Sequence, residues 1–190
     1  MISGRRVSTS ISCEDTAVAR LSELVALRCG YSSSAARRLR AAALLHDIGK
    51  LAIPGHILNK PGKLTAAEFA VIKTHTLIGA RMLSGIPGGF GIMARNIALF
   101  HHERYSGGGG YWGVPLSRLP AYISIVHICD IYTALLSERV YQIENNGLYI
   151  GKTALLKEKR IHGSIRFLFN SCGFLYAFLM YSQNKLIYLN

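Results

Sequence analysis

The sequence predicts an all-α domain, a helical bundle with a metal site at its centre. Three observations lead to this prediction. Apolar residues recur with helical spacing through most of residues 13–142. Capping and glycine signals mark where the helices begin and end. Histidines and aspartates stand at helix ends or within apolar helical runs, in pairs that suit metal binding. Nothing in residues 1–142 demands a β-strand.

The first two helices are predicted within residues 14–49. Between residues 14 and 29 the apolar side chains follow helical spacing, and Gly30 then ends the helix. The positions that carry this spacing are Val18, Leu21, Leu24 and Val25. The serines at 32–34 can cap a second helix over residues 35–49, which Gly49 stops and Pro54 follows.

Three further helices are predicted after a loop rich in Lys, Pro and Gly at residues 56–64. Thr65 and Glu68 have capping-box spacing, which predicts a helix from there to about residue 83. Its inward face would carry Ile72, His75, Gly79 and Met82. Residues 84–91 interrupt the chain, and a fourth helix is expected over residues 92–102. After four consecutive glycines at 107–110, a fifth helix runs from near residue 120 to about 136.

Composition bounds the cellular setting and the partners. There are 22 Lys and Arg against 10 Asp and Glu, a net charge of +12, which attracts polyanions without identifying one. We find no stacking platform or groove-reading helix, so nucleic-acid binding is not favoured. The N-terminus lacks an apolar signal region, and the cysteines have no zinc-finger spacing, so a reducing cytoplasm is expected. The cysteines are Cys13, Cys29, Cys129 and Cys172, of which Cys29 and Cys129 fit core positions.

The chain divides into three parts: an N-terminal extension at 1–12, a domain at 13–142 and an atypical, aromatic-rich tail at 143–190. Asn170, Ser171 and Gly173 interrupt the apolar run of the tail, which is also short for a membrane span. The tail could be a core helix, a membrane-associated segment or a stretch never selected to fold with the rest. Membrane contact is the less favoured of these.

Histidines and aspartates form the pattern that carries chemistry. Taken singly, a helical His is more often a satisfied core residue, and an Asp in an apolar helix a buried hydrogen-bond partner. Together they match the mixed N and O ligand sets of hydrolytic zinc, iron or manganese sites. Neighbouring helical residues point about 100° apart, so the His46–Asp47 pair can reach two metal ions, with Asp47 bridging them. Burying such groups without metal would cost several kcal/mol. The set is His46, Asp47, His75, His101, His102 and Asp130.

Three runs of sequence resemble HD-GYP domains, helical members of the HD phosphohydrolase superfamily. They are LLHDIGKLAIPGHILNKPGKLTAAEFAVIKTHTLIGARML, HHERYSGGGGYWG and CDIYTALLSERVY. The resemblance implies an HD-superfamily helical bundle that hydrolyses the bacterial second messenger cyclic di-GMP, to the linear dinucleotide pGpG or on to GMP. It also implies two divalent metal ions, iron or manganese being expected.

The resemblance assigns roles to residues. The six His and Asp side chains above fall on the metal ligands, and Asp47 and Lys50 on catalytic positions, with Lys50 against the scissile phosphate. Arg139 matches an arginine near the ligand phosphates, and Gly110 and Tyr111 belong to the substrate-facing signature loop. The alternative for Lys50 and Arg139 is an ordinary solvated base.

Several positions depart from the family pattern. No histidine precedes His46; Asp15 takes the place of the first-helix ligand and is either a further metal ligand or a helix N-terminal acid. Ile11 replaces an additional glutamate ligand, so a third metal is not expected. Trp112 replaces the proline of the Gly-Tyr-Pro signature, and Gln142 replaces a phosphate-binding lysine.

After residue 142 the chain no longer aligns with the family, so the domain is expected to be incomplete at its C-terminal end. A rearrangement or frameshift is one hypothesis for the tail. The leading functional hypothesis is a cyclic di-GMP phosphodiesterase in signal transduction. A catalytically degenerate signalling or binding module, and a phosphohydrolase of another nucleotide, are the alternatives. Because no sensory or receiver domain precedes residue 13, such a domain or a diguanylate cyclase is expected as a separate partner.

Overall fold

The computed structural model describes residues 12–108 and 110–142, with side chains described as far as Ala134. The secondary-structure elements of the described residues are all helices, with no β-strand among them, which confirms the all-α prediction. The elements are α1 (Cys13–Arg28), α2 (Ser33–Ala43), the 3-10 helix η1 (Ile48–Ala52), α3 (Gly55–Leu58), α4 (Ala66–Met82), α5 (Gly88–Phe100), the 3-10 helix η2 (Leu116–Arg118) and α6 (Ala121–Gln142).

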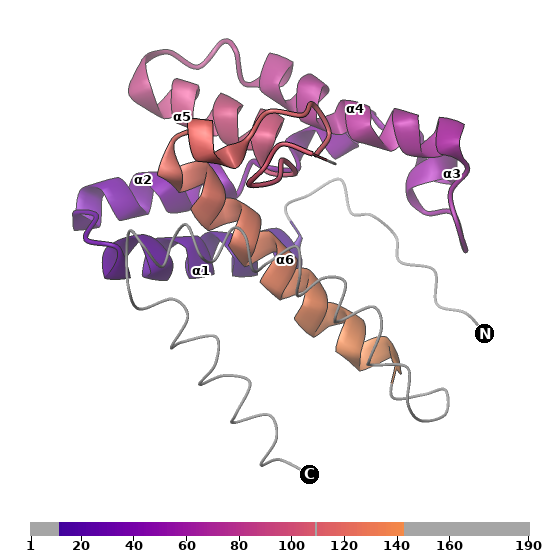
Figure 1. Ribbon diagram of the computed structural model, residues 1–190, viewed down its shortest axis with the longest axis horizontal. Helices are drawn as coiled ribbons and strands as arrows, with labels where there is room; N and C mark the ends of the chain where they lie inside the picture. Colours follow the sequence, from indigo (N-terminus) through magenta and orange to yellow (C-terminus); the bar gives the residue numbers. More distant parts are fainter. Residues whose placement is uncertain (1–11, 109, 143–190) are drawn as a thin grey trace.

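Two helical hairpins and one long helix make up the bundle (Figure 1). One hairpin is α1 with α2, and the other is α4 with α5. Helix α6 packs across α1, α5 packs on α2, and η1 lies against α4. The first half of α4 and the short α3 project beyond the bundle (Figure 1). The turns that follow α2 and α5 therefore come to lie beside the middle of α4.

The core lies between α1, α2, α5 and α6. It is built from small residues at helix contacts and from fully buried branched side chains, whose removal from water stabilises the bundle. The largest apolar ones are Val18, Leu39, Ile97, Leu116, Ile123, Ile125 and Val126. Cys129 is buried in this core, which raises the pKa of its thiol to about 12. Cys29 packs against its edge, as expected, and Cys172 lies outside the described residues.

Helix starts follow the capping signals. The predicted capping box of Thr65 and Glu68 is confirmed, with the Thr65 hydroxyl accepting from Glu68 N–H and the Glu68 carboxylate from Thr65 N–H. The sequence analysis missed a second capping box, in which Ser12 and Asp15 start α1 in the same way. This cap fixes the position of Asp15 at the first turn of α1.

The end of α2 differs from the prediction. The helix ends at Ala43 rather than near Gly49, and the chain continues through 3-10-type turns, with His46 N–H donating to Ala43 O at 3.2 Å. The His46 ring also donates to the Ala43 carbonyl oxygen. If α2 continued by a fourth turn, the N–H of Asp47 would need the same oxygen, so the ring competes with a longer helix. His46 and Asp47 therefore lie in the turn beyond α2, and Gly49 lies within η1.

Three smaller expectations were wrong. Helix α5 begins at Gly88, whose φ of 73° suits glycine, so residues 88–91 belong to the helix rather than to a break. The predicted loop at 56–64 contains most of the short α3. Met82, expected on the inward face of α4, is half exposed, because the buried stripe ends at Gly79 and Ala80 near the last turn.

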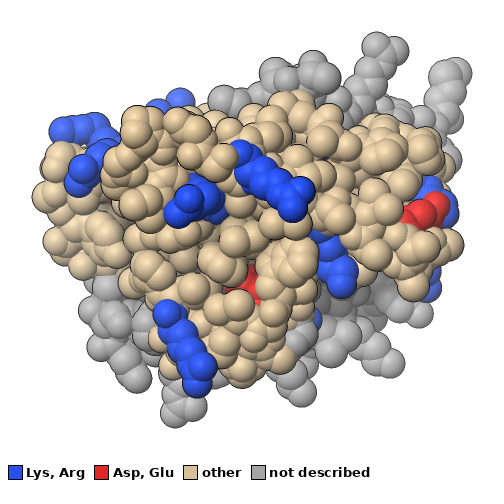
Figure 2. Space-filling view, turned by 90° about the horizontal axis from the view of Figure 1, so that it is seen from above, with Lys and Arg blue, Asp and Glu red and all other residues tan. Residues whose placement is uncertain are grey.

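The charged side chains on one face of the described residues are mostly Lys and Arg (Figure 2). In the view of Figure 2, Lys and Arg side chains are spread over the surface and few Asp or Glu side chains are visible. None of the helices within the described residues has the length and apolar character that crossing a membrane requires. The tail at 143–190, for which membrane contact was considered, lies outside the described residues.

Candidate metal centre

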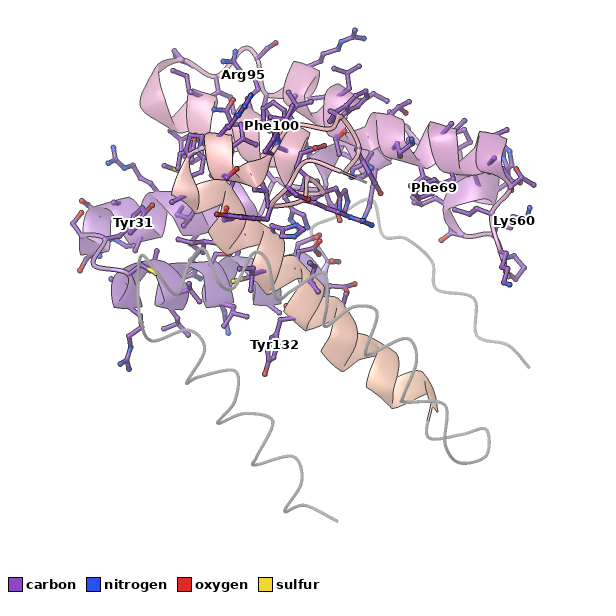
Figure 3. All side chains as sticks on the ribbon, in the orientation of Figure 1. Tyr31, Lys60, Phe69, Arg95, Phe100 and Tyr132 are labelled. Atoms are coloured by element: carbon purple, nitrogen blue, oxygen red, sulfur yellow. The ribbon has the colours of Figure 1, made fainter. Side chains whose placement is uncertain are left out.

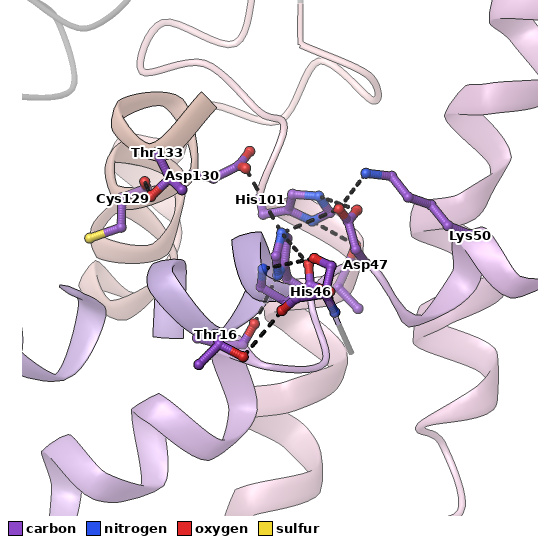
Figure 4. A network of polar contacts seen from close by, with 12 residues as sticks. Thr16, His46, Asp47, Lys50, His101, Cys129, Asp130 and Thr133 are labelled. Atoms are coloured by element: carbon purple, nitrogen blue, oxygen red, sulfur yellow. Dashed lines mark hydrogen bonds and ion pairs between the residues drawn. The ribbon is translucent and has the colours of Figure 1, made fainter. Parts of the chain in front are cut away.

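Five elements bring the predicted metal ligands to one place (Figure 4). The turn after α2 carries two of them, the middle of α4 one, and the residues directly beyond α5 two more. Helices α6 and α1 add one carboxylate each at the periphery. In this order the side chains are His46, Asp47, His75, His101, His102, Asp130 and Asp15.

Asp47 is the centre of the cluster. Its Oδ1 lies 3.2 Å from His75 Nε2 and 3.6 Å from His101 Nε2, and its Oδ2 lies 3.4 Å from His46 Nε2. Two sets of side chains can each place their ligand atoms within 4.8 Å of one another, and Asp47 belongs to both. One set is Asp47, His75, His101 and His102, and the other is Asp15, His46 and Asp47.

The imidazoles are oriented by the main chain. Nδ1 of His46, His75 and His101 lies 2.8, 2.7 and 3.0 Å from backbone carbonyl oxygens three or four residues earlier. Because a carbonyl oxygen only accepts, each Nδ1 carries the hydrogen. In the neutral ring, Nε2 therefore presents its lone pair to the cluster, which is the arrangement that metal-binding histidines require.

These lone pairs meet one oxygen of a carboxylate, Asp47 Oδ1, while Lys50 pairs with the other oxygen. Asp47 Oδ1, His75 Nε2 and His101 Nε2 are buried atoms without a hydrogen bond in the described part of the chain. Unprotonated Nε2 atoms facing a carboxylate oxygen at 3.2–3.6 Å repel it unless a positive charge lies between them. The residues present thus fit a divalent cation, and this His and Asp cluster could hold one.

The electrostatics favour a cation at this point. Burial opposes ionisation of Asp47, but the positive charges of His46, foremost, and of Lys50 hold the pKa of its carboxyl well below the usual range. Burial lowers the pKa of His101 and His102, which favours the neutral form of both rings. For His46, the carboxylates of Asp47 and of nearby acids outweigh burial and raise the pKa. The same negative charge that favours a proton on His46 would also favour a metal ion beside its ring.

The peripheral acids lie close to His46 and farther from the other ligands. Asp130 Oδ1 is 3.9 Å and Asp15 Oδ1 4.0 Å from His46 Nε2. Asp15 is a helix N-terminal acid, since its Oδ2 accepts the Ser12 N–H of the capping box at 2.8 Å, and it also belongs to the second candidate ligand set. Lys50, from η1, forms an ion pair with Asp47 Oδ2; burial lowers the pKa of its ammonium group, but Asp47 outweighs this and raises it.

The glycine loop is fixed against the cluster by Glu103. The carboxylate of this fully buried residue accepts the N–H of Trp112 at 2.6 Å and of Val114 at 2.8 Å. A Cβ on Gly110 would lie 2.5 Å from Glu103 Oε2, so only glycine fits there. The Tyr111 ring packs on His102, with centroids 4.5 Å apart. Gly110 thus holds the loop close, and Tyr111 borders the ligand set.

Two site residues were missed from sequence, and one predicted residue is outside the described side chains. Glu103 could have been noticed as an acid directly after the His101–His102 pair. His127, whose ring donates to His101 O at 2.7 Å, was hidden in an apolar run with no distinguishing signal. Arg139 lies on the last turns of α6, where side chains are not described.

Comparison with known proteins identifies the family. An HD domain model matches residues 5–147, so the chain belongs to the HD domain family. The resemblance to HD-GYP proteins expected from the sequence is confirmed by the relatives below. The fold is similar to that of Bd1817, an HDG"Y"P protein from Bdellovibrio bacteriovorus, with a TM-score of 0.56 and 22% identity over 68% of this chain and 42% of that one.

Curated relatives are similar over the described domain. The cyclic di-GMP phosphodiesterase response regulator RpfG of Xanthomonas campestris is 45% identical over 119 residues, 63% of this chain and 32% of that protein. A cyclic di-GMP phosphodiesterase of Thermotoga maritima is 41% identical over 122 residues, 64% and 33% of the two chains. The 3'3'-cGAMP-specific phosphodiesterase 3 of Vibrio cholerae is 35% identical over 148 residues, 78% and 31%. The chain thus spans about a third of the length of these relatives.

Proposed function

We propose that the chain is a metal-dependent phosphodiesterase that hydrolyses cyclic di-GMP to pGpG, to GMP or to both. The observation that carries this proposal is the position of Asp47, whose two oxygens face two different ligand sets. A carboxylate shared in this way suits a pair of divalent cations a few ångströms apart, and such pairs are suited to in-line displacement at phosphorus. Iron or manganese is proposed because the ligands are imidazole nitrogens and carboxylate oxygens, with no thiolate.

The proposed ligands divide between two cations. His75, His101 and His102 would hold one, and His46 with Asp15 the other, and Asp47 would contribute to both sets. Asp130, 3.9 Å from His46 Nε2, would complete the second set after a small rotation of its side chain. When bound, the cations would supply Lewis-acid activation of the phosphate and a nucleophilic water at neutral pH.

The chain's own residues bind and orient the substrate. Lys50 reaches Asp47 from η1 and keeps its positive charge at the edge of the cluster, where it would neutralise charge that develops on the scissile phosphate. Arg139 is proposed to hold a phosphate as a bidentate donor. Gly110 brings the loop close, and Tyr111 beside His102 would contact the nucleotide. Burial of the histidines keeps bulk water from the ligand atoms.

The substrate class rests on the relatives, whose names specify cyclic di-GMP or 3'3'-cGAMP. Cyclic di-GMP is preferred because the two relatives of higher identity act on it by name. The positive surface would attract either dinucleotide. A sensory or receiver protein, or a diguanylate cyclase, is proposed as the partner that regulates turnover.

The test is hydrolysis by protein purified without oxygen and supplied with iron or manganese. Cyclic di-GMP and 3'3'-cGAMP are offered in parallel, and products are separated by chromatography. We expect turnover of cyclic di-GMP and its loss in Asp47→Ala, together with a fall in bound metal measured by mass spectrometry. Preference for 3'3'-cGAMP would move the proposal to the other dinucleotide.

A binding module without turnover is the second candidate, and Asp15 is the observation that favours it. A carboxylate replaces the expected imidazole in the ligand set of His46, and it is shared with a helix cap. The set of Asp15, His46 and Asp47 then has one imidazole fewer, and its affinity for a metal ion would be lower. Nucleotide binding with metal present and no products would support this candidate; an Asp15→His variant that gains turnover would identify the cause.

A further inference from the structure

Trp112 is exposed but held rigidly, a combination that core packing does not explain. Its side chain is 44% exposed. Its N–H donates to Glu103 Oε1 at 2.6 Å, and its indole Nε1–H donates to Thr76 Oγ1 at 3.0 Å. The Thr76 hydroxyl in turn donates to Lys73 O at 3.0 Å, so its lone pair is directed to the indole. Both ends of the residue are therefore fixed while much of its ring faces solvent.

Tyr111, the residue before Trp112, belongs to a row of aromatic rings that leads away from the candidate metal ligands. Tyr111 packs on His102 at 4.5 Å between centroids, and Phe69 meets Tyr111 edge-on at 6.0 Å. Phe69 is also 44% exposed, and it lies on the part of α4 that projects from the bundle (Figure 3). Lys73 Nζ lies 5.6 Å from the centre of the Phe69 ring. The row begins at a candidate ligand and ends in solvent beside a positive charge.

The loop that carries two of these rings is preorganised. A Cβ on Gly107 would lie 2.7 Å from Gly113 O, and Gly107 has a φ of 81°, so the loop folds closely on itself. Its ends are joined by the Leu116 N–H to Arg104 O hydrogen bond at 3.0 Å. Rings held in this way lose little further entropy when a flat ligand stacks on them.

We propose that Trp112 and Phe69, with Tyr111 between the metal centre and Phe69, form a stacking subsite for a purine base of the substrate, with Lys73 as the cation at its edge. This inference rests on the proposed function, because the base belongs to a nucleotide whose phosphate lies at the metal centre. Exposed aromatic faces bind bases by stacking without a need for sequence-specific hydrogen bonds. Lys73 supplies a donor for an acceptor edge of the purine or for the second phosphate.

The chain contains a single tryptophan, so its intrinsic fluorescence reports on this subsite directly. Full-length protein is titrated with GMP, and ribose 5-phosphate serves as the ligand that has the phosphate but no base. We expect saturable quenching by GMP, and displacement of GMP by ribose 5-phosphate only at concentrations on the order of 5- to 150-fold higher. Phe69→Ala should weaken GMP binding severalfold while leaving Trp112 in place as the reporter.

Matched variants separate stacking from a general loss of structure. Met82→Ala removes an apolar side chain of similar exposure from the far end of α4 and should leave GMP binding unchanged. Phe69→Tyr keeps a ring and should restore binding. Phe69→Ala is expected to raise the KM for cyclic di-GMP more than it changes kcat, since it removes contact with the base and not with the reacting phosphate.

The outcomes for the subsite and for the proposed function are distinguishable. Base-dependent quenching in a protein that hydrolyses no dinucleotide would support the subsite and overturn the phosphodiesterase. Turnover of cyclic di-GMP with no saturable quenching, or with equal affinity for ribose 5-phosphate, would overturn the subsite alone. Equal GMP affinity in Phe69→Ala and Met82→Ala would overturn it as well.

Discussion

A methyl group on Gly49 should separate the two halves of the metal centre. Gly49 lies in η1 against α4, where a Cβ would stand 1.9 Å from His75 O and 2.6 Å from Gly79 N. Real Cβ atoms essentially never come within 3.0 Å of such atoms, so η1 must move away from α4 by about 1 Å or more. Both obstacles are backbone atoms and cannot rotate aside. Overpacking usually lowers the free energy of unfolding by about 1–3 kcal/mol, and we expect the loss in Gly49→Ala to lie at the upper end of this range.

The displacement acts on the site because Asp47 immediately precedes η1, whereas His75 is on α4. Their 3.2 Å contact would widen by a similar amount. A loss of about 3 kcal/mol corresponds to a Tm fall of about 10 °C for a domain of this size. A misplacement of about 1 Å can reduce turnover by about 100-fold. Circular dichroism gives the Tm, and mass spectrometry of the dialysed protein gives bound metal.

Gly55→Ala is the matched control. A Cβ there has only Asn59 Nδ2 nearby, at 3.9 Å, and Gly55 is not one of the glycines with a positive φ. We expect a Tm within about 3 °C of the unsubstituted protein, because an exposed helical Gly-to-Ala change alters stability by less than about 1 kcal/mol. The reasoning is refuted if Gly49→Ala and Gly55→Ala unfold at the same temperature and retain equal amounts of metal.

Three further predictions concern single side chains. Thr65→Ala removes the cap of α4 and should lower the free energy of unfolding by about 1 kcal/mol, measured by urea denaturation. The ion pair with Lys60 and the cap lower the pKa of Glu68 to about 2, so their stabilising effect is fully present above the usual carboxyl pKa and is lost as pH falls toward 2. The Tm difference between the unsubstituted protein and Glu68→Gln should therefore be constant near neutral pH and shrink below about pH 4.5; an unchanged difference at pH 3 would contradict this. Cys129, buried and with its pKa raised to about 12, should be alkylated only on unfolding, while exposed Cys13 reacts in the folded protein, as peptide mass mapping would show.

Helix starts were predictable because their signals are local. The capping box at Thr65 involves residues three apart, and its geometry follows from the backbone alone. The end of α2 was not predictable from local signals, since apolar periodicity continues through Leu44 and Leu45. What ends the helix is tertiary: the chain turns so that Gly49 can meet the α4 backbone at His75. Periodicity does not report such a contact.

The candidate site was predictable where residue type alone carries the signal. His46, Asp47, His75, His101 and His102 come together as the sequence predicted. Glu103 and Trp112 were not assigned roles, because those roles depend on how the glycine loop folds back. A buried Glu that accepts two backbone N–H groups looks in sequence like any acid after a helix. The sequence analysis found no stacking platform for the same reason: Phe69 and Tyr111 are far apart along the chain.

The ends of α2 and α5 explain why the candidate metal ligands stand in adjacent pairs just beyond helices. The last carbonyls of a helix lack intrahelical donors and carry partial negative charge. His46 Nδ1–H donates to Ala43 O at the end of α2, and His101 Nδ1–H to Ile97 O and Ala98 O at the end of α5. These hydrogen bonds satisfy the carbonyls and aim each Nε2 at Asp47. The C-termini of α2 and α5 both carry negative partial charge and face the same point. They therefore favour a cation there in addition to the contribution of the side chains. A longer α2 would move His46 into the helix, so the early end of α2 sets the place of the His46 ring in the candidate metal centre.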